Sequence, residues 1–280
     1  PISDDEDPSE NAAKQIKQWE TFFNGTSNKE RLVARYLYEH LFQAHLHFDG
    51  TDNREFYRLV RSASPPGEPV EIIPSRRPYN DPLGYVYYRL GRHQGSIVAK
   101  THMVYELSDK RLHRYRELFI DKPYEVNSLP SYKSAVASNP IKTFADIPVN
   151  SRYKFLLDEA RFFIEGFIKG PVCRGQVALS VIEDQFWVVF FDPDASIMSS
   201  DDAQLDTAAD YLASPAEMED NFQLISGQIH YQKLFEKYMA VREAYSKEFE
   251  PVDVKQAMKY IWKGEGKNPN AALTVFRHMD

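Results

Sequence analysis

The chain has 280 residues, of which 42% are hydrophobic and 14% aromatic, which excludes an intrinsically disordered chain and supports a sizeable core. Its formal net charge of −7 argues against non-specific nucleic-acid binding, which needs a dense basic surface. The single cysteine, Cys173, excludes an intramolecular disulfide, a cysteine zinc site and a C-x-x-C-H haem attachment built from these residues. No apolar run approaches the roughly 20 residues that cross a bilayer.

The two ends of the sequence indicate how the chain is divided. It begins with proline and ends at Asp280, directly after a strand-like segment, so we expect a piece of a longer protein, truncated at both ends. Residues 1–26 are expected to form an acidic lead and a first helix over 11–23. Residues 27–280 are expected to form one α+β domain.

The most regular pattern predicts a helix over 28–48. Ser27 is followed three residues later by Glu30, which is the spacing of a capping box. Apolar side chains then recur at helical spacing, at Val33, Tyr36, Leu37, Leu41, Ala44 and Phe48.

The rest of the chain alternates short strands, helices and one long loop. Residues 64–82 hold six prolines, a density that excludes a regular element. Strands are expected over 54–62, over 84–90 and 95–107 as a hairpin, and over 186–191. Ser108 and Ser151 are expected to cap helices, and further helices are expected over 206–213, 226–249 and 252–263. The predicted fold class is α+β, a helix-rich domain with short, largely antiparallel strands.

Histidines interrupt the apolar stripe of the predicted helix over 28–48. His40 and His47 are seven residues apart, so two helical turns would place them on nearly the same side. Imidazoles there suit metal or haem ligands, or proton shuttles. The alternative is that both are core residues hydrogen-bonded to carbonyl or carboxylate groups. A second candidate pair is His102 and Met103, because both residue types serve as axial haem ligands.

Arginines gather in the predicted strand over 54–62 and in the proline-rich loop. Arg61, Arg76 and Arg77, together with Arg58, offer guanidinium forks for a carboxylate or phosphate. The alternative is ordinary salt bridging to the acidic surplus of the chain. Arg174 follows Cys173 and could lower the pKa of a nucleophilic thiol, although a buried structural thiol is the competing interpretation.

Several strings, in order along the chain, together resemble the bacterial fatty acid cis/trans isomerase family. The similarity extends over roughly residues 30–280, and no P-loop, G-x-G-x-x-G or G-x-S-x-G motif points elsewhere. The strings are those at 35–42 (RYLYEHLF), 44–47 (AHLH), 56–61 (FYRLVR), 65–67 (PPG), 76–79 (RRPY), 100–102 (KTH), 169–176 (KGPVCRGQ) and 186–190 (FWVVF).

The resemblance implies a periplasmic enzyme that converts cis double bonds of unsaturated fatty acids or phospholipid acyl chains to trans. It also implies a covalent haem c on a C-x-x-C-H motif, and this chain departs from the family pattern because it has no such motif. We expect the haem to be held by a segment upstream of Pro1. Peripheral membrane contact and no nucleic-acid partner are expected.

Within the resemblance, residue type and position suggest roles. The catalytic candidates are His40, His47 and Arg174, the substrate-binding candidates are Arg61, Arg76 and Arg77, and the cofactor-binding candidates are His102 and Met103.

Three other functions compete with the isomerase. The first is a non-catalytic lipid-binding or docking module of a larger periplasmic protein. The second is a metal-dependent hydrolase that uses His40, His47 and a carboxylate such as Glu39. The third is a structural interaction domain.

Overall fold

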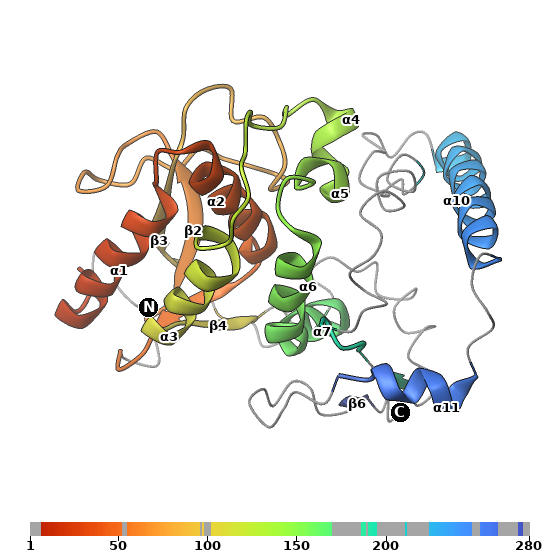
Figure 1. Cartoon of the computed structure of the whole chain (residues 1–280). Helices are drawn as coiled ribbons and strands as arrows, with labels where there is room; N and C mark the ends of the chain where they lie inside the picture. Colours follow the sequence, from red (N-terminus) through yellow and green to blue (C-terminus); the bar gives the residue numbers. More distant parts are fainter. Residues whose placement is uncertain are drawn as a thin grey trace.

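A computed structural model describes residues 7–51, 55–95, 97, 102–169, 186–188, 190–194, 211, 224–247, 253–262 and 274–276. The fold is α+β, as expected from the sequence, with a four-stranded sheet next to which α1, α2 and α3 lie (Figure 1). The helices are α1 (Glu10–Phe23), α2 (Asn28–Leu41), α3 (Asp109–Tyr115) with the π-helical turn η2 (Arg116–Ile120), α4 (Ser134–Ala137), α5 (Pro140–Thr143), α6 (Val149–Asp158), α7 (Ala160–Lys169), α10 (Leu224–Ser246), and α11 (Val254–Ala257) with the 3-10 turn η6 (Met258–Tyr260).

The sheet is mixed. Its strands are β1 (His45–Phe48), β2 (Tyr57–Ser62), β3 (Tyr87–Arg92) and β4 (Val104–Leu107), in the order β3-β2-β1-β4. β2 runs antiparallel to both neighbours, whereas β4 runs parallel to β1. The predicted hairpin between 84–90 and 95–107 is therefore wrong, because β3 and β4 lie at opposite edges. A separate antiparallel pair joins β5 (Phe186–Val188) to β6 (Thr274–Phe276).

The second helix is shorter than the sequence pattern predicts. Ser27 and Glu30 form the expected capping box, but α2 ends at Leu41. His45–Phe48 is instead strand β1, which pairs with β4 and β2. Pairing on both sides overrides the helical periodicity of this segment, because inter-strand hydrogen bonds and core burial outweigh local propensity.

One face of the sheet carries the core. Leu46 pairs with Tyr57 and Tyr105, and Leu59 pairs with Leu90, so their side chains share a face. All of them are buried. Helix α2 packs on this face, and aromatic rings from several helices extend the core toward α6; they include Trp19, Tyr36, Tyr115, Phe119 and Phe155.

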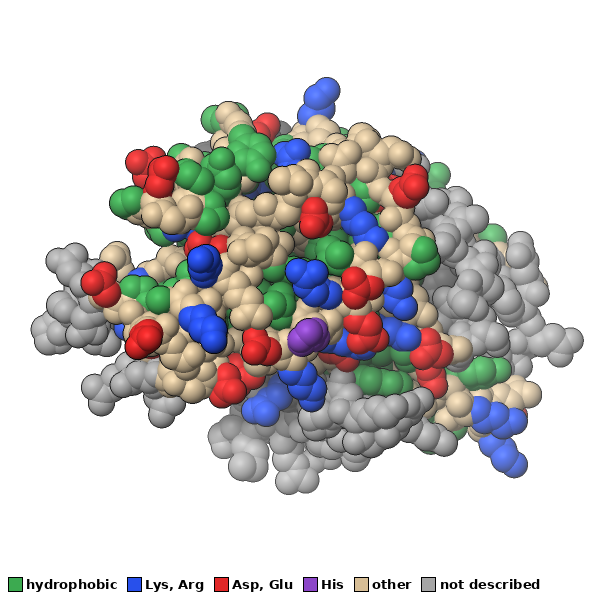
Figure 2. Space-filling model, turned by 60° about the vertical axis from the view of Figure 1, so that its left-hand side comes forward, with side chains coloured by type: hydrophobic (Ala, Val, Ile, Leu, Met, Phe, Trp, Pro, Cys, Tyr) green, Lys and Arg blue, Asp and Glu red, His purple; other side chains and the backbone are tan. Residues whose placement is uncertain are grey.

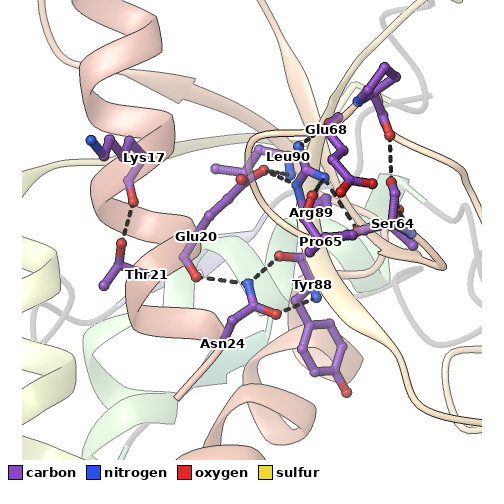
Figure 3. A network of polar contacts seen from close by, with 12 residues as sticks. Lys17, Glu20, Thr21, Asn24, Ser64, Pro65, Glu68, Tyr88, Arg89 and Leu90 are labelled. Atoms are coloured by element: carbon purple, nitrogen blue, oxygen red, sulfur yellow. Dashed lines mark hydrogen bonds and ion pairs between the residues drawn. The ribbon is translucent and has the colours of Figure 1, made fainter. Parts of the chain in front are cut away.

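The segment that joins β2 to β3, residues 63–86, has no helix or extended strand, as its prolines predict. We call it the Pro-rich loop. Two buried arginines of the sheet hold it by its backbone. Arg89 donates to the carbonyls of Ser64, Pro65 and Glu68 and forms an ion pair with Glu20 of α1, at 2.9 Å (Figure 3). Arg61 donates to the carbonyls of Pro78 and Asn80.

Other predicted helices differ in their details. Ser108 precedes α3 but its side chain makes no capping hydrogen bond. Ser151 lies inside a helix rather than at its start, and the predicted helix over 151–168 is two helices, α6 and α7, because the chain leaves the helical conformation at Glu159. The helix predicted over 206–213 falls almost wholly outside the described residues.

The surface shows no concentration of one charge sign on the face in Figure 2. Lysine and arginine side chains alternate there with aspartate and glutamate. Among the described residues, no helix is both long and apolar enough to cross a membrane.

Candidate functional site

Four histidines come from three strands of the sheet and the segments beside them. His45 and His47 belong to β1, His93 directly follows β3, and His102 lies two residues before β4. The ring of His45 lies 4.6 Å from that of His93 and 4.8 Å from that of His102, measured between centroids. We call these four residues the histidine face.

Strand alternation explains why the imidazoles gather. His45 and His47 flank Leu46, which points into the core, so both point to the opposite face of the sheet. Phe56, directly before β2, occupies the centre of this group, with its ring 4.8 Å from His102 and 6.1 Å from His47. The backbone N–H of His93 donates to the carbonyl of Phe56 at 2.9 Å and extends the β2–β3 pairing to this edge.

His45 is a neutral imidazole whose orientation is fixed by the backbone. Its Nδ1 accepts the N–H of Met103 at 3.2 Å, so the ring proton is assigned to Nε2. Burial lowers the pKa of His45 to about 4, and repulsion from His93, Arg58 and His102 adds to this effect. Because one nitrogen is occupied and the other is protonated, His45 suits a positioning role better than metal ligation.

His93 differs from His45 in having a free nitrogen. Its Nε2 is buried and has no hydrogen-bond partner among the residues that the structure describes. Burial lowers the pKa of His93, and Arg58 and His102 lower it further. A neutral imidazole with an unshared nitrogen is the form that binds a metal or a haem iron. Sequence reasoning missed His93, because it lay in the expected hairpin turn.

His40 and His47 do not come together. His40 lies on α2, on the core side, among the rings of Tyr36, Phe144, Phe155 and Phe163. Its Nδ1 contacts the carbonyl of Tyr36 at 2.7 Å, and burial lowers its pKa to about 4. The predicted same-side arrangement with His47 is wrong, because His47 belongs to a strand.

The side chains of His102 and Met103 point to opposite faces of the sheet, as adjacent residues in extended backbone do. His102 faces Phe56 and His45. Met103 is 4% exposed and belongs to the core cluster, and its sulfur and methyl group lie beside Gly166 of α7. Only His102 of this predicted pair therefore contributes to the histidine face.

The predicted arginines are also dispersed. Arg61 is 1% exposed and donates to two carbonyls of the Pro-rich loop. Arg76 is exposed on that loop, and Arg77 lies over the ring of Tyr79. Arg174 lies outside the described residues. Arg58, by contrast, lies near the histidine face and donates to the carbonyl of Phe42 at 2.8 Å.

The metal-hydrolase alternative gains no site in the described part of the chain. Glu39 forms an ion pair with Arg35, one turn away on α2, at 2.8 Å, and the strand position of His47 separates it from His40. Within the described residues, no group of three or more His, Cys, Asp or Glu side chains is arranged to hold a metal ion. A single axial ligand to a haem iron does not require such a group.

Comparison with known proteins gives one informative result. No curated protein and no solved structure matched the chain. The model of the fatty acid cis/trans isomerase (CTI) family matches residues 1–280, the whole chain. This confirms the resemblance drawn from the strings at 35–42 and onward, and the chain belongs to the fatty acid cis/trans isomerase family.

Proposed function

We propose that this chain is part of a haem-dependent, periplasmic isomerase that converts cis double bonds of unsaturated fatty acyl chains to trans without saturating them. The observation that carries the proposal is the family match over all 280 residues. The histidine face supports the haem component, because it gathers imidazoles on the face of the sheet opposite Leu46, where burial lowers the pKa of His45 and of His93.

The residues of this chain can supply an axial ligand to a haem c, but they cannot supply its covalent attachment. Covalent attachment needs two cysteines, and the sequence has only Cys173, so the attachment would come from outside these residues. Axial ligation needs one nitrogen, and Nε2 of His93 fits because it is buried without a hydrogen-bond partner in the described part of the chain. We assign His93 as the ligand and His45 as a positioning residue.

A haem held by His93 would supply an electrophilic iron, a group able to weaken the π bond of a neighbouring acyl chain and so lower the barrier to rotation. The protein residues prepare this environment. Burial, and then repulsion from Arg58 and His102, lowers the pKa of His93, so its ring stays neutral. The buried ring of Phe56 packs against His102 and His47 and makes their surroundings apolar. The sequence carries no nicotinamide-binding motif that would supply a hydride, which fits isomerisation without saturation.

Contact with the membrane is proposed to be peripheral. No helix among the described residues can cross a bilayer, whereas the substrate is an acyl chain. Leu83 and Tyr85 of the Pro-rich loop, 91% and 57% exposed, are suited to lie against lipid.

The decisive experiment uses the full parent protein, exported and haem-loaded, in a host whose lipids contain no trans fatty acids. Gas chromatography of membrane fatty acids gives the trans/cis ratio, and absorption spectroscopy reports the haem ligand. We expect trans acids with the wild type, and at least a tenfold lower ratio with a shifted Soret band for His93→Ala. His93→Met, which keeps a ligand atom, should retain a six-coordinate spectrum.

The matched control is His113→Ala, which removes an exposed imidazole from α3. It should leave both the ratio and the spectrum unchanged. If His93→Ala behaves like this control, His93 is not the ligand. If the haem-loaded wild type produces no trans acids, the isomerase proposal fails and a non-catalytic lipid-binding module becomes the better explanation.

A further inference from the structure

A small pocket lies where the end of α1, the first turns of α2 and the Pro-rich loop meet. Its volume is about 80 Å³. The walls include Arg31 and Arg35 of α2, Gly84 and Tyr85 of the Pro-rich loop, and Tyr132. The two arginines are the charged residues in this lining, so the pocket is electropositive.

Arg35 is held rigidly in the wall of this pocket. It is 4% exposed, its Nε contacts Oε1 of Glu39 at 2.8 Å, and its Nη1 donates to the carbonyl of Pro130 at 3.1 Å. The guanidinium carbon lies 3.8 Å from the centroid of the Tyr132 ring. Nη2 is buried and has no hydrogen-bond partner among the described residues. Such a nitrogen is costly to leave unsatisfied, so an acceptor brought by a ligand would stabilise it.

The charges around the pocket do not balance within the described residues. Arg61 lies 5.4 Å from the Tyr132 ring, donates only to backbone carbonyls and forms no ion pair there. Arg31 likewise forms no ion pair with a described residue. Among the described residues, Glu39 is the one carboxylate that forms an ion pair with these arginines, through Arg35. Burial raises the pKa of Glu39, so its carboxylate neutralises the positive charge less completely. Two guanidiniums line the pocket and, in the described part of the chain, only that of Arg35 is paired with a carboxylate, so a surplus of positive charge favours a bound anion there.

The size of the pocket limits what the anion can be. A cavity of about 150 Å³ can hold a benzene molecule. A space about half that size fits a carboxylate, which has half as many heavy atoms as benzene, better than it fits a phosphodiester headgroup. A planar carboxylate also matches the fork of a guanidinium.

The rim of the pocket is apolar. Leu83 and Tyr85 are largely exposed beside it, and Leu83 is held outward with a φ of 59°, in the left-handed region that leucine rarely adopts. An alkyl chain leaving the pocket would cover these side chains.

We propose that this pocket binds the carboxylate of a free fatty acid, with Arg35 and Arg31 as its anchors. The identification of the tail as an acyl chain rests on the proposed function. This site differs from the substrate-binding arginines expected from the sequence. The guanidinium of Arg61 is hydrogen-bonded to backbone carbonyls of the Pro-rich loop, and Arg76 is not among the residues that line the pocket.

Calorimetric titration of the full parent protein with oleate, below its aggregation concentration, tests this proposal. Oleate should bind at least tenfold more tightly than its methyl ester, which has the same tail and no charge. Arg35→Gln should weaken oleate binding at least tenfold and leave the ester unchanged, because only the charge-assisted hydrogen bonds are lost. Lys110→Gln, which removes one exposed charge from α3, is the matched control and should bind oleate as the wild type does.

Two further variants keep the test valid if Arg35→Gln does not fold. Arg31→Gln removes a less buried anchor and should weaken oleate binding severalfold. Gly84 lines the pocket and a Cβ there meets no atom within 4 Å, so Gly84→Phe is tolerated sterically; the added ring should obstruct access to the pocket and reduce the preference for oleate over its ester.

Equal binding of oleate and its ester by the wild type would overturn the proposal. Displacement of oleate by equimolar inorganic phosphate would assign the pocket to phosphate instead. None of these measurements depends on haem or on turnover. A negative binding result would therefore reject the carboxylate pocket without rejecting the isomerase proposal, and a protein that makes no trans acids could still bind oleate in this pocket.

Discussion

The rings of His45 and His93 meet edge to face, 4.6 Å apart and at 85°, although β1 and β3 are not neighbours in the sheet. Strand β2 lies between them, and Phe56, directly before β2, places its ring 6.4 Å from that of His45 and accepts the backbone N–H of His93. Burial lowers the pKa of both imidazoles, and repulsion from His93 lowers the pKa of His45 further. The pair therefore remains neutral at neutral pH, as the proposed ligation of a haem iron by His93 would require.

Buried neutral histidines make the fold sensitive to acid. The pKa of His40 and of His45 falls from 6.5 to about 4 on folding. Below pH 6.5 the unfolded chain binds protons that the folded chain does not, so stability falls as the pH drops toward 4 and then levels off. We expect His40→Gln to remove on the order of 2 kcal/mol of this pH-dependent loss, measured by urea unfolding between pH 7 and pH 4.

The corresponding variant of an exposed histidine, His113→Gln, should leave the pH dependence as it is in the wild type. An identical slope for wild type and His40→Gln would show that His40 titrates normally in the folded protein.

Arg61 is expected to stabilise the Pro-rich loop. It is buried and donates to the carbonyls of Pro78 and Asn80, geometry that a lysine cannot reproduce. Arg61→Lys should lower the free energy of unfolding by about 2 kcal/mol and expose residues 63–86 to limited proteolysis. Arg76→Lys, on the same loop but exposed, should change stability by less than about 0.5 kcal/mol. Unchanged proteolysis in Arg61→Lys would argue against this structural role.

The ion pair between Glu20 and Arg89 links α1 to the sheet (Figure 3). Glu20 also accepts the N–H of Leu90 through Oε1, at 2.9 Å. Glu20→Gln leaves the Arg89 charge buried without a carboxylate, so we expect a loss of about 3 kcal/mol in chemical denaturation. The double variant Glu20→Gln, Arg89→Met removes that stranded charge and should cost less than the sum of the two single changes; additive losses would show that the pair is not coupled.

Two serines that precede helices provide a matched comparison. Ser27 accepts the N–H of Glu30 in a complete capping box, whereas Ser108 makes no capping hydrogen bond. Ser27→Ala should therefore cost about 1 kcal/mol, and Ser108→Ala less than about 0.5 kcal/mol, in thermal or urea unfolding. Equal costs would mean that the sequence pattern, and not the hydrogen bond, identifies a cap.

Local chemistry explains what could be predicted from the sequence. The capping box at Ser27 and Glu30 depends on a spacing of three residues, and the irregularity of the Pro-rich loop depends on the missing N–H groups and fixed φ of its prolines. The family also follows from the sequence alone, because ordered strings of residues identify it. None of these features requires knowledge of distant contacts.

The histidine face and the pocket lined by Arg31 and Arg35 depend on contacts that only the tertiary structure supplies. His45 and His47 follow a helical pattern in the sequence, but pairing with β4 and β2 makes them part of a strand. His93 joins them only because β2 brings β3 alongside β1, and Arg61 is occupied only because the Pro-rich loop folds back over it. Long-range strand pairing and loop closure decide these positions, because their free energy comes from residues far away in the sequence.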